Sequence, residues 1–183
     1  MSQIIATQFR QVADGFAARI EATPADRWSA PSPCADWTAR DVVEHVLGGL
    51  RMVLSSITGG TPDPVTENTD LVAAWHEIQQ NVLTSLSDPE TAARSFRSPI
   101  GEMTFEQAVA RLAVIEVLVH TWDLARAVGG DERLDADLVR QAHEQFKPLD
   151  SRLRGTGAFG PKVEPPAGAD AQTEFLCFLG RQV

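Results

Sequence analysis

The chain has 183 residues, of which 43% are hydrophobic and 22% are charged, and its formal net charge is −9. The length suits one domain with a sizeable core, and the composition is that of an ordinary soluble globular protein. The negative charge argues against nucleic-acid backbones and anionic membranes as partners, and no apolar run approaches the roughly 20 residues of a membrane helix. Residues 1–10 lack the pattern of a secretory signal. We expect one cytoplasmic domain over residues 1–183, with Cys34 and Cys177 as free thiols.

The first half of the chain predicts two long helices joined by a rigid connection. Apolar residues recur at helical spacing through Ser2–Ala22, and Pro24 ends that stretch. A proline-rich segment with two tryptophans follows, Trp28–Trp37. Thr38 then begins the second helix in a capping box that has Asp41 in place of the usual glutamate, and Gly59 closes it.

The middle of the chain predicts a loop, a third helix and a fourth, longer one. Thr61–Thr69 has loop composition, and Asp70–Ser87 carries apolar residues on one helical face. Ser95–Met103 contains a turn signal between short extended runs, which favours a small hairpin. The longest helix is predicted over Thr104–Val128, with a capping box at Thr104 and Gln107.

The rest of the chain, after Val128, is predicted to form short helices and irregular structure in addition to the four long helices. We expect a fifth helix over Asp135–Phe146, irregular structure over Lys147–Ala169 and a short apolar helix over Glu174–Leu179. Four helices with short connections indicate an all-α protein, namely a four-helix bundle with short extra helices and a small hairpin.

A cluster of metal-type side chains is predicted between two of the helices. Glu116 and His120 lie one turn apart on one face of the longest helix, and His45 lies in the middle of the second. A carboxylate and imidazoles are costly in an apolar core unless they are paired or bound to a metal. Because neighbouring helices pack about 8–10 Å apart, His45 is within reach of the other two. Two imidazoles and a carboxylate suit zinc, nickel or iron(II).

A plainer interpretation of the same residues stays open. A carboxylate and a histidine one turn apart often form only a surface pair, and a single histidine such as His45 is often a hydrogen-bonded structural residue.

Other polar residues are predicted to have minor roles. We expect His76 and His143 at the surface, and Cys34 to be packed rather than nucleophilic. Asp123 is predicted either to orient a ligand imidazole or to face solvent at the helix end, and Asp41, on the His45 face, is a second candidate for orienting a ligand.

Two ligand segments and two short C-terminal segments carry a resemblance to a known family. Residues 33–49, PCADWTARDVVEHVLGG, resemble the N-terminal segment of the mycothiol-dependent maleylpyruvate isomerase-like proteins, within the wider DinB-like family of metal-binding helix bundles. Residues 116–127, EVLVHTWDLARA, resemble the second ligand helix of that family, and residues 159–163 and 178–181 look like an actinobacterial branch of it.

The resemblance implies a metal site, a thiol cosubstrate and a bundle that departs from simple up-down order. The family's ligand pattern matches His45, Glu116 and His120 one for one, with zinc as the first candidate metal and nickel or iron as the others. It implies mycothiol as cosubstrate and an electrophilic small molecule as substrate. The family's isomerase carries an additional C-terminal domain for which this chain is too short, which puts the maleylpyruvate substrate in doubt.

The functional prediction is a divalent-metal-binding protein that acts as a thiol-dependent transferase or isomerase. The alternatives are a non-catalytic metal-binding module and a metal-dependent hydrolase. We expect a monomer or a homodimer. The sequence names no catalytic acid or base.

Overall fold

The computed structural model describes residues 2–98, 101–150, 154 and 160–183. The chain divides into two compact units, one ending at Glu132 and the other running from Arg133 to Val183, and each is described by itself. The prediction of one domain over residues 1–183 stays a prediction. Within the described residues, no helix combines the length and the apolar character needed to cross a membrane.

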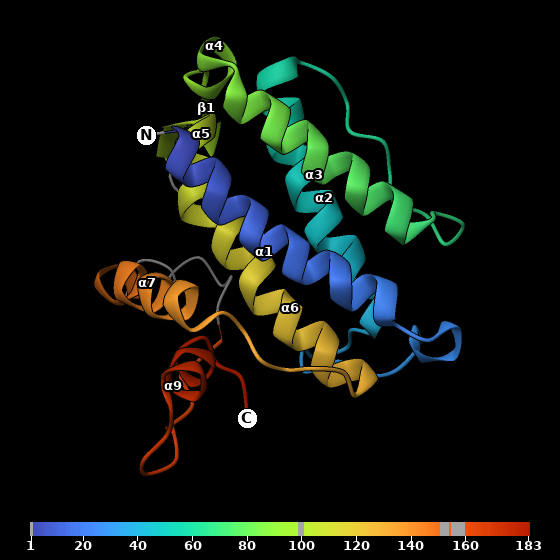
Figure 1. Cartoon of the computed structure of the whole chain (residues 1–183), viewed down its shortest axis with the longest axis vertical. Helices are drawn as coiled ribbons and strands as arrows, with labels where there is room; N and C mark the ends of the chain where they lie inside the picture. The colour runs from blue at the N-terminus through green and yellow to red at the C-terminus, as the bar shows by residue number, and fades with distance from the viewer. Residues whose placement is uncertain (1, 99–100, 151–153, 155–159) are drawn as a thin grey trace. The chain divides into compact units, whose positions relative to one another are not determined.

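Four long helical segments form the bundle of the first unit. Helix α1 packs against α3 and α6, and α2 packs against the same two helices; Figure 1 shows α1 (blue) between α3 and α6. The consecutive helices α1 and α2 are therefore diagonal rather than adjacent, as the resemblance implied. The all-α bundle is confirmed. Its helices are α1 (Ser2–Ala22), α2 (Ala39–Thr58), α3 (Leu71–Ser87) and α6 (Val114–Val128).

The apolar stripes predicted from helical spacing form the bundle core. Phe9, Phe16 and Trp75 are fully buried, and the rings of Phe16 and Trp75 meet edge to face with centroids 4.7 Å apart. The Trp75 indole N–H donates to the Ala13 carbonyl across 3.1 Å, so this large side chain is buried with its polar group satisfied.

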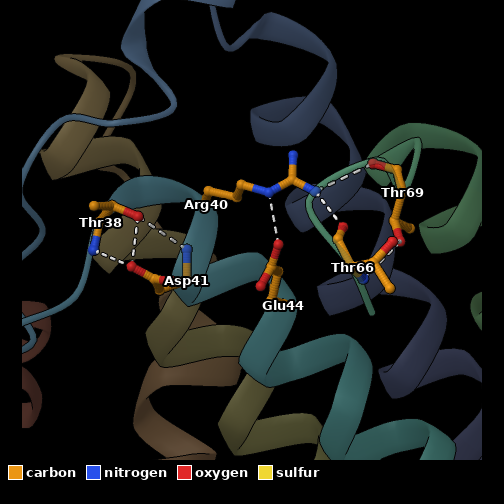
Figure 2. Close-up of polar contacts among 6 residues, drawn as sticks. All are labelled: Thr38, Arg40, Asp41, Glu44, Thr66 and Thr69. Carbon is orange, nitrogen blue, oxygen red and sulfur yellow. Dashed lines mark hydrogen bonds and ion pairs between the residues drawn. The ribbon is translucent and has the colours of Figure 1, made fainter. Parts of the chain in front are cut away.

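Helix α2 starts as the sequence predicts. The Thr38 hydroxyl accepts from the Asp41 backbone N–H at 3.2 Å, and the Asp41 carboxylate accepts from the Thr38 N–H at 2.7 Å (Figure 2). These reciprocal bonds satisfy two donors that a helix start leaves unpaired. The hydrogen bond from the Thr38 hydroxyl is the main cause that lowers the pKa of Asp41.

Arg40 ties the same end of α2 to the loop before α3. Its guanidinium donates to Glu44 at 2.6 Å and to the backbone carbonyls of Thr66 and Thr69 at 2.8 and 3.3 Å (Figure 2). The predicted loop over Thr61–Thr69 is confirmed, and it is held by these contacts.

A short helix and a two-stranded hairpin follow α3. Helix α4 (Pro89–Ala92) leads into β1 (Ser95–Ser98), which pairs antiparallel with β2 (Gly101–Thr104). The hairpin prediction is confirmed for the strands, and residues 99–100 of the predicted turn lie outside the described residues.

The longest helix contains a π-helical turn that periodicity does not predict. Helix α5 (Phe105–Ala108), capped by the Thr104–Gln107 box, continues through the π-turn Val109–Ala113 into α6, which ends at Gly129 with φ of 73°. Because a π-turn holds one residue more than an α-turn, the buried face moves by one position there. Regular helical spacing from Phe105 and Val109 would place Leu112 on the buried face, but Leu112 is only half-buried and Ala113 is buried instead.

Within its described residues, the second unit contains helices α7 (Ala136–Phe146) and α9 (Ala171–Phe178), which pack against each other. Helix α7 is followed by a 3₁₀ turn, Lys147–Leu149, inside the segment predicted to be irregular. Helix α9 begins three residues before the predicted start, because Asp170 accepts from the backbone N–H of Thr173 at 2.8 Å. Residues 151–153 and 155–159 of the irregular segment lie outside the described residues.

Candidate metal centre

Helices α2 and α6 bring three metal-type side chains together. His45 Nε2 lies 2.6 Å from Glu116 Oε1, and His120 Nε2 lies 3.2 Å from the same oxygen. The three ligand atoms are all within 4.8 Å of one another. The i, i+4 spacing places Glu116 and His120 on one face of α6, and the packing of α2 on α6 supplies His45.

The cluster is buried on one side and open on the other. The His120 side chain is only 6% exposed, whereas those of Glu116 and His45 are 38% and 43% exposed. A small molecule therefore has access to the cluster from the side of His45 and Glu116, and the His120 side is closed by the bundle.

Asp123 lies behind His120, on the face away from Glu116. Its carboxylate is completely buried, and Oδ2 lies 2.8 Å from His120 Nδ1. This excludes the alternative in which Asp123 faces solvent at the helix end. The contact is close but not aligned as a hydrogen bond. Asp41 was the second residue predicted to orient a ligand. Among the described residues its side chain and backbone N–H form the α2 capping box with Thr38, so its role there is helix capping.

Cys34 joins this group from the loop before α2. Its thiol donates to Asp123 Oδ2 across 3.5 Å, and Cys34, Asp123 and His120 form a second set of metal-type groups within 4.8 Å of one another. Sequence spacing did not reveal this contact, because 89 residues separate Cys34 from Asp123. The available signal was that Cys34 lies in residues 33–49, the first of the segments that resemble the family.

The Trp37 ring lies against the rings of His45 and His120. Its ring centroid lies 4.6 Å from that of His45 and 6.0 Å from that of His120. A tight turn places it there: the Trp37 N–H donates to the Cys34 carbonyl at 3.1 Å, and Asp36 between them has a left-handed φ of 64°. Left-handed backbone at a non-glycine residue is uncommon and is found often at functional sites.

The polar neighbours of the cluster change the pKa values of two of its members. Burial alone would raise the pKa of Glu116, but the hydrogen bonds from His120 and His45 outweigh it and hold the pKa well below its usual range. Burial alone would lower the pKa of His120, but its polar contacts, with Asp123 first among them, raise the pKa well above the ordinary value. Without metal, an ionised Glu116 thus faces a protonated His120.

The donor set fits a divalent ion. Ligand atoms bound to one zinc ion at about 2.0–2.2 Å lie at most about 4.4 Å apart, so small side-chain movements bring all three into bonding range. The carboxylate already lies between the two imidazole nitrogens, and Asp123 is placed to orient the ring of His120.

The other two histidines lie outside this cluster. His76 is exposed and pairs with Glu21 at 2.9 Å, as predicted for a surface residue. His143 was predicted at the surface, but it is half-buried, with its ring 5.9 Å from that of Phe175 and 5.2 Å from that of Phe178. Its pKa is lowered, chiefly by this burial.

The bundle and its His–Glu–His cluster define a class of all-α proteins that carry a metal-type donor set between two helices. The chain belongs to the family of the mycothiol maleylpyruvate isomerase N-terminal domain, whose profile matches residues 9–125. The resemblance identified from the sequence is thereby confirmed.

Relatives of full length occur in mycobacteria. In each of two strains of Mycobacterium tuberculosis, a protein described only as uncharacterized is 31% identical over 185 residues, covering 100% of this chain and 100% of the relative. No solved structure matches the chain significantly.

Proposed function

We propose that the chain binds one divalent metal ion through His45, Glu116 and His120, and that it acts as a mycothiol-dependent transferase or isomerase. The observation that carries the proposal is the convergence of the three donors at a site that is closed on one side and open on the other. Zinc is the first candidate, because it accepts this mixture of nitrogen and oxygen ligands, with nickel or iron(II) next.

The open side supports an enzyme more than a purely structural site. Structural zinc sites are closed by four protein ligands, whereas catalytic sites keep a position for a small molecule. Here three side chains form the set, and two of them are more than a third exposed. A bound divalent ion would supply a Lewis acid that favours the thiolate form of a thiol placed beside it.

The protein's own residues then have separate roles. Glu116 and the two histidines would hold the ion, and Asp123 would keep the His120 ring in place from behind. The Trp37 indole lies against both imidazoles and would exclude water from that side of the site. The family name supports mycothiol as the thiol, and its partner in the reaction would be an electrophilic small molecule.

Replacing His45 by alanine tests the metal site. The His45→Ala variant should fold, since His45 is half-exposed and the apolar core does not depend on it, but two ligands on α6 should hold zinc only weakly. Metal content and chelator-competition Kd are the measurements. His76→Ala is the matched control, because it removes another exposed histidine in the same unit and should leave metal content unchanged.

A thiol assay separates the enzyme from its alternatives. Zinc-loaded wild-type protein should bind mycothiol in calorimetry and transfer it to an electrophile, and His45→Ala should lose both. Metal binding without thiol binding would favour the non-catalytic module or a hydrolase that uses metal-bound water. A His45→Ala variant that folds, lacks metal and still works at the wild-type rate would refute the metalloenzyme.

A further inference from the structure

A single carboxylate oxygen links the Pro-rich loop to the candidate metal centre. Asp123 Oδ2 lies 2.8 Å from His120 Nδ1 and accepts from the Cys34 thiol at 3.5 Å. The carboxylate is fully buried, so its position depends on the protein groups around it. The thiol is thus one of the groups that can hold the oxygen in place against the imidazole.

The orientation of the His120 ring depends on Asp123 Oδ2, because Nδ1 lies close to this oxygen without forming an aligned hydrogen bond. His120 Nδ1 is buried, and its short contact with Asp123 is not aligned as a hydrogen bond. Glu116 lies at the other nitrogen and Trp37 lies against the ring, so at Nδ1 the ring position depends on how well the carboxylate is fixed by its other partners. Rotation of the imidazole about its Cβ–Cγ bond would move Nε2, the nitrogen that lies 3.2 Å from Glu116.

Cys34 is well placed to fix the carboxylate, because its backbone is held on both sides. The Cys34 N–H donates to the Ser32 hydroxyl at 3.2 Å, and the Cys34 carbonyl accepts from the Trp37 N–H at 3.1 Å. Ser32 and Trp37 are also joined directly, through a backbone hydrogen bond of 2.8 Å. The thiol therefore projects from a braced turn rather than from a loose loop.

We propose that Cys34 is a positioning residue of the metal centre, which acts through Asp123 to hold the His120 ring with Nε2 toward the ion. The inference rests on the proposed function, since it concerns the same site. The Cys34 thiol is then neither a ligand nor a nucleophile, and the turn that holds Cys34 helps to fix the position of His120.

A pair of variants isolates the hydrogen-bond donor. Cys34→Ala and Cys34→Ser place side chains of similar size in the loop, and only serine can donate to Asp123. Cobalt(II) and zinc Kd values, measured by chelator competition, should weaken by about 10-fold or more for alanine, the usual cost of losing an outer partner of a ligand. Serine should recover much of that loss. Cys177→Ala, which removes the buried thiol of α9, should leave Kd unchanged.

A double-variant cycle tests whether Cys34 acts through Asp123. In an Asp123→Ala background, Cys34→Ala should cost no further metal affinity, because the oxygen that the thiol and the imidazole share is already gone. Independent, additive losses would show that Cys34 contributes only to general packing, and would overturn the proposal.

Two spectroscopic measurements complete the test. In metal-free protein, Cys34→Ala should shift the nitrogen NMR resonances of the His120 ring, and Cys177→Ala should not. If wild-type protein bound no metal, the proposed function would fail and these resonances alone would decide the positioning role. Unchanged resonances together with unchanged Kd refute it. A cobalt–thiolate charge-transfer band that disappears in Cys34→Ala also refutes it, because Cys34 would then be a ligand.

Discussion

Each ring nitrogen of His120 lies beside a different carboxylate, and the protonation of the ring therefore depends on both of them. Nε2 lies against Glu116 and Nδ1 against Asp123, so in the metal-free protein the ring sits between two carboxylates. A proton stabilises this arrangement, and a metal ion at Nε2 must replace that proton. The metal-free and metal-loaded proteins should accordingly respond to pH in opposite directions.

The metal-free protein should lose stability on the alkaline side. The pKa of His120 is raised above the unfolded value of about 6.5, so its contribution is complete below that pH and is lost as the pH rises through the folded pKa. The pKa of Glu116 is lowered, so its contribution is present above about pH 4.3 and is lost as the pH falls through the folded pKa. Thermal denaturation in chelator should show Tm falling above about pH 6.5, and His120→Asn should remove that fall.

The metal-loaded protein should show the reverse trend. Histidine ligands must lose their protons to bind, and the pKa of His120 is raised, so zinc affinity should fall as the pH drops through that raised pKa. The difference in Tm between zinc-loaded and chelated protein should therefore grow as the pH rises, and His76→Ala should keep this behaviour. Parallel Tm curves with and without zinc would contradict two histidine ligands.

At the scale of elements, the π-turn Val109–Ala113 sets the position of Glu116 and His120 relative to α5. It adds one residue to the helix between the Thr104 cap and Glu116, which turns the face that carries Glu116 and His120 relative to α5. π-Turns of this kind occur often at functional sites.

Deletion of one residue in this turn should be tolerated better than deletion elsewhere. Removing Arg111, which is exposed, converts the π-turn to an α-turn and leaves the register on both sides nearly intact. Removing Asn81, exposed in the regular helix α3, shifts every later residue of that helix by one position. The Arg111 deletion should keep the higher Tm in circular dichroism. Equal losses for the two deletions would show that the π-turn has no such tolerance.

At the scale of the whole molecule, metal binding should stabilise the unit that contains the cluster. The donors come from α2 and α6, so an ion would join two helices that are far apart in the sequence. Zinc at about 100 times Kd adds about 2.7 kcal/mol if it binds only the folded state. This corresponds to a Tm increase of roughly 5–10 °C for a protein of this size. Calorimetry should show the increase in wild-type protein and not in His45→Ala, and an equal increase in both would place the zinc elsewhere.

Much of the fold follows from local patterns in the sequence. Several features depend on neighbours within a few residues, and the structure agrees with each. They are the Ser2–Ala22 helix, the capping boxes at Thr38 and Thr104 and the end of the longest helix at Val128. The pairing of Glu116 with His120 is equally local, because helical spacing alone places them together.

Contacts between distant segments could be decided only by the tertiary structure. The reach of His45 to Glu116, the burial of Asp123, the thiol of Cys34 beside it and the half-burial of His143 all depend on which elements pack together. The π-turn is likewise beyond periodicity, since one extra residue in a helix leaves no local sequence signal. The sequence by itself determined the helices and named His45, Glu116 and His120 as candidate ligands. The packing of α2, α6 and the loop that carries Cys34 decided that these groups meet, because only folding brings residues so far apart in the chain within a few ångströms.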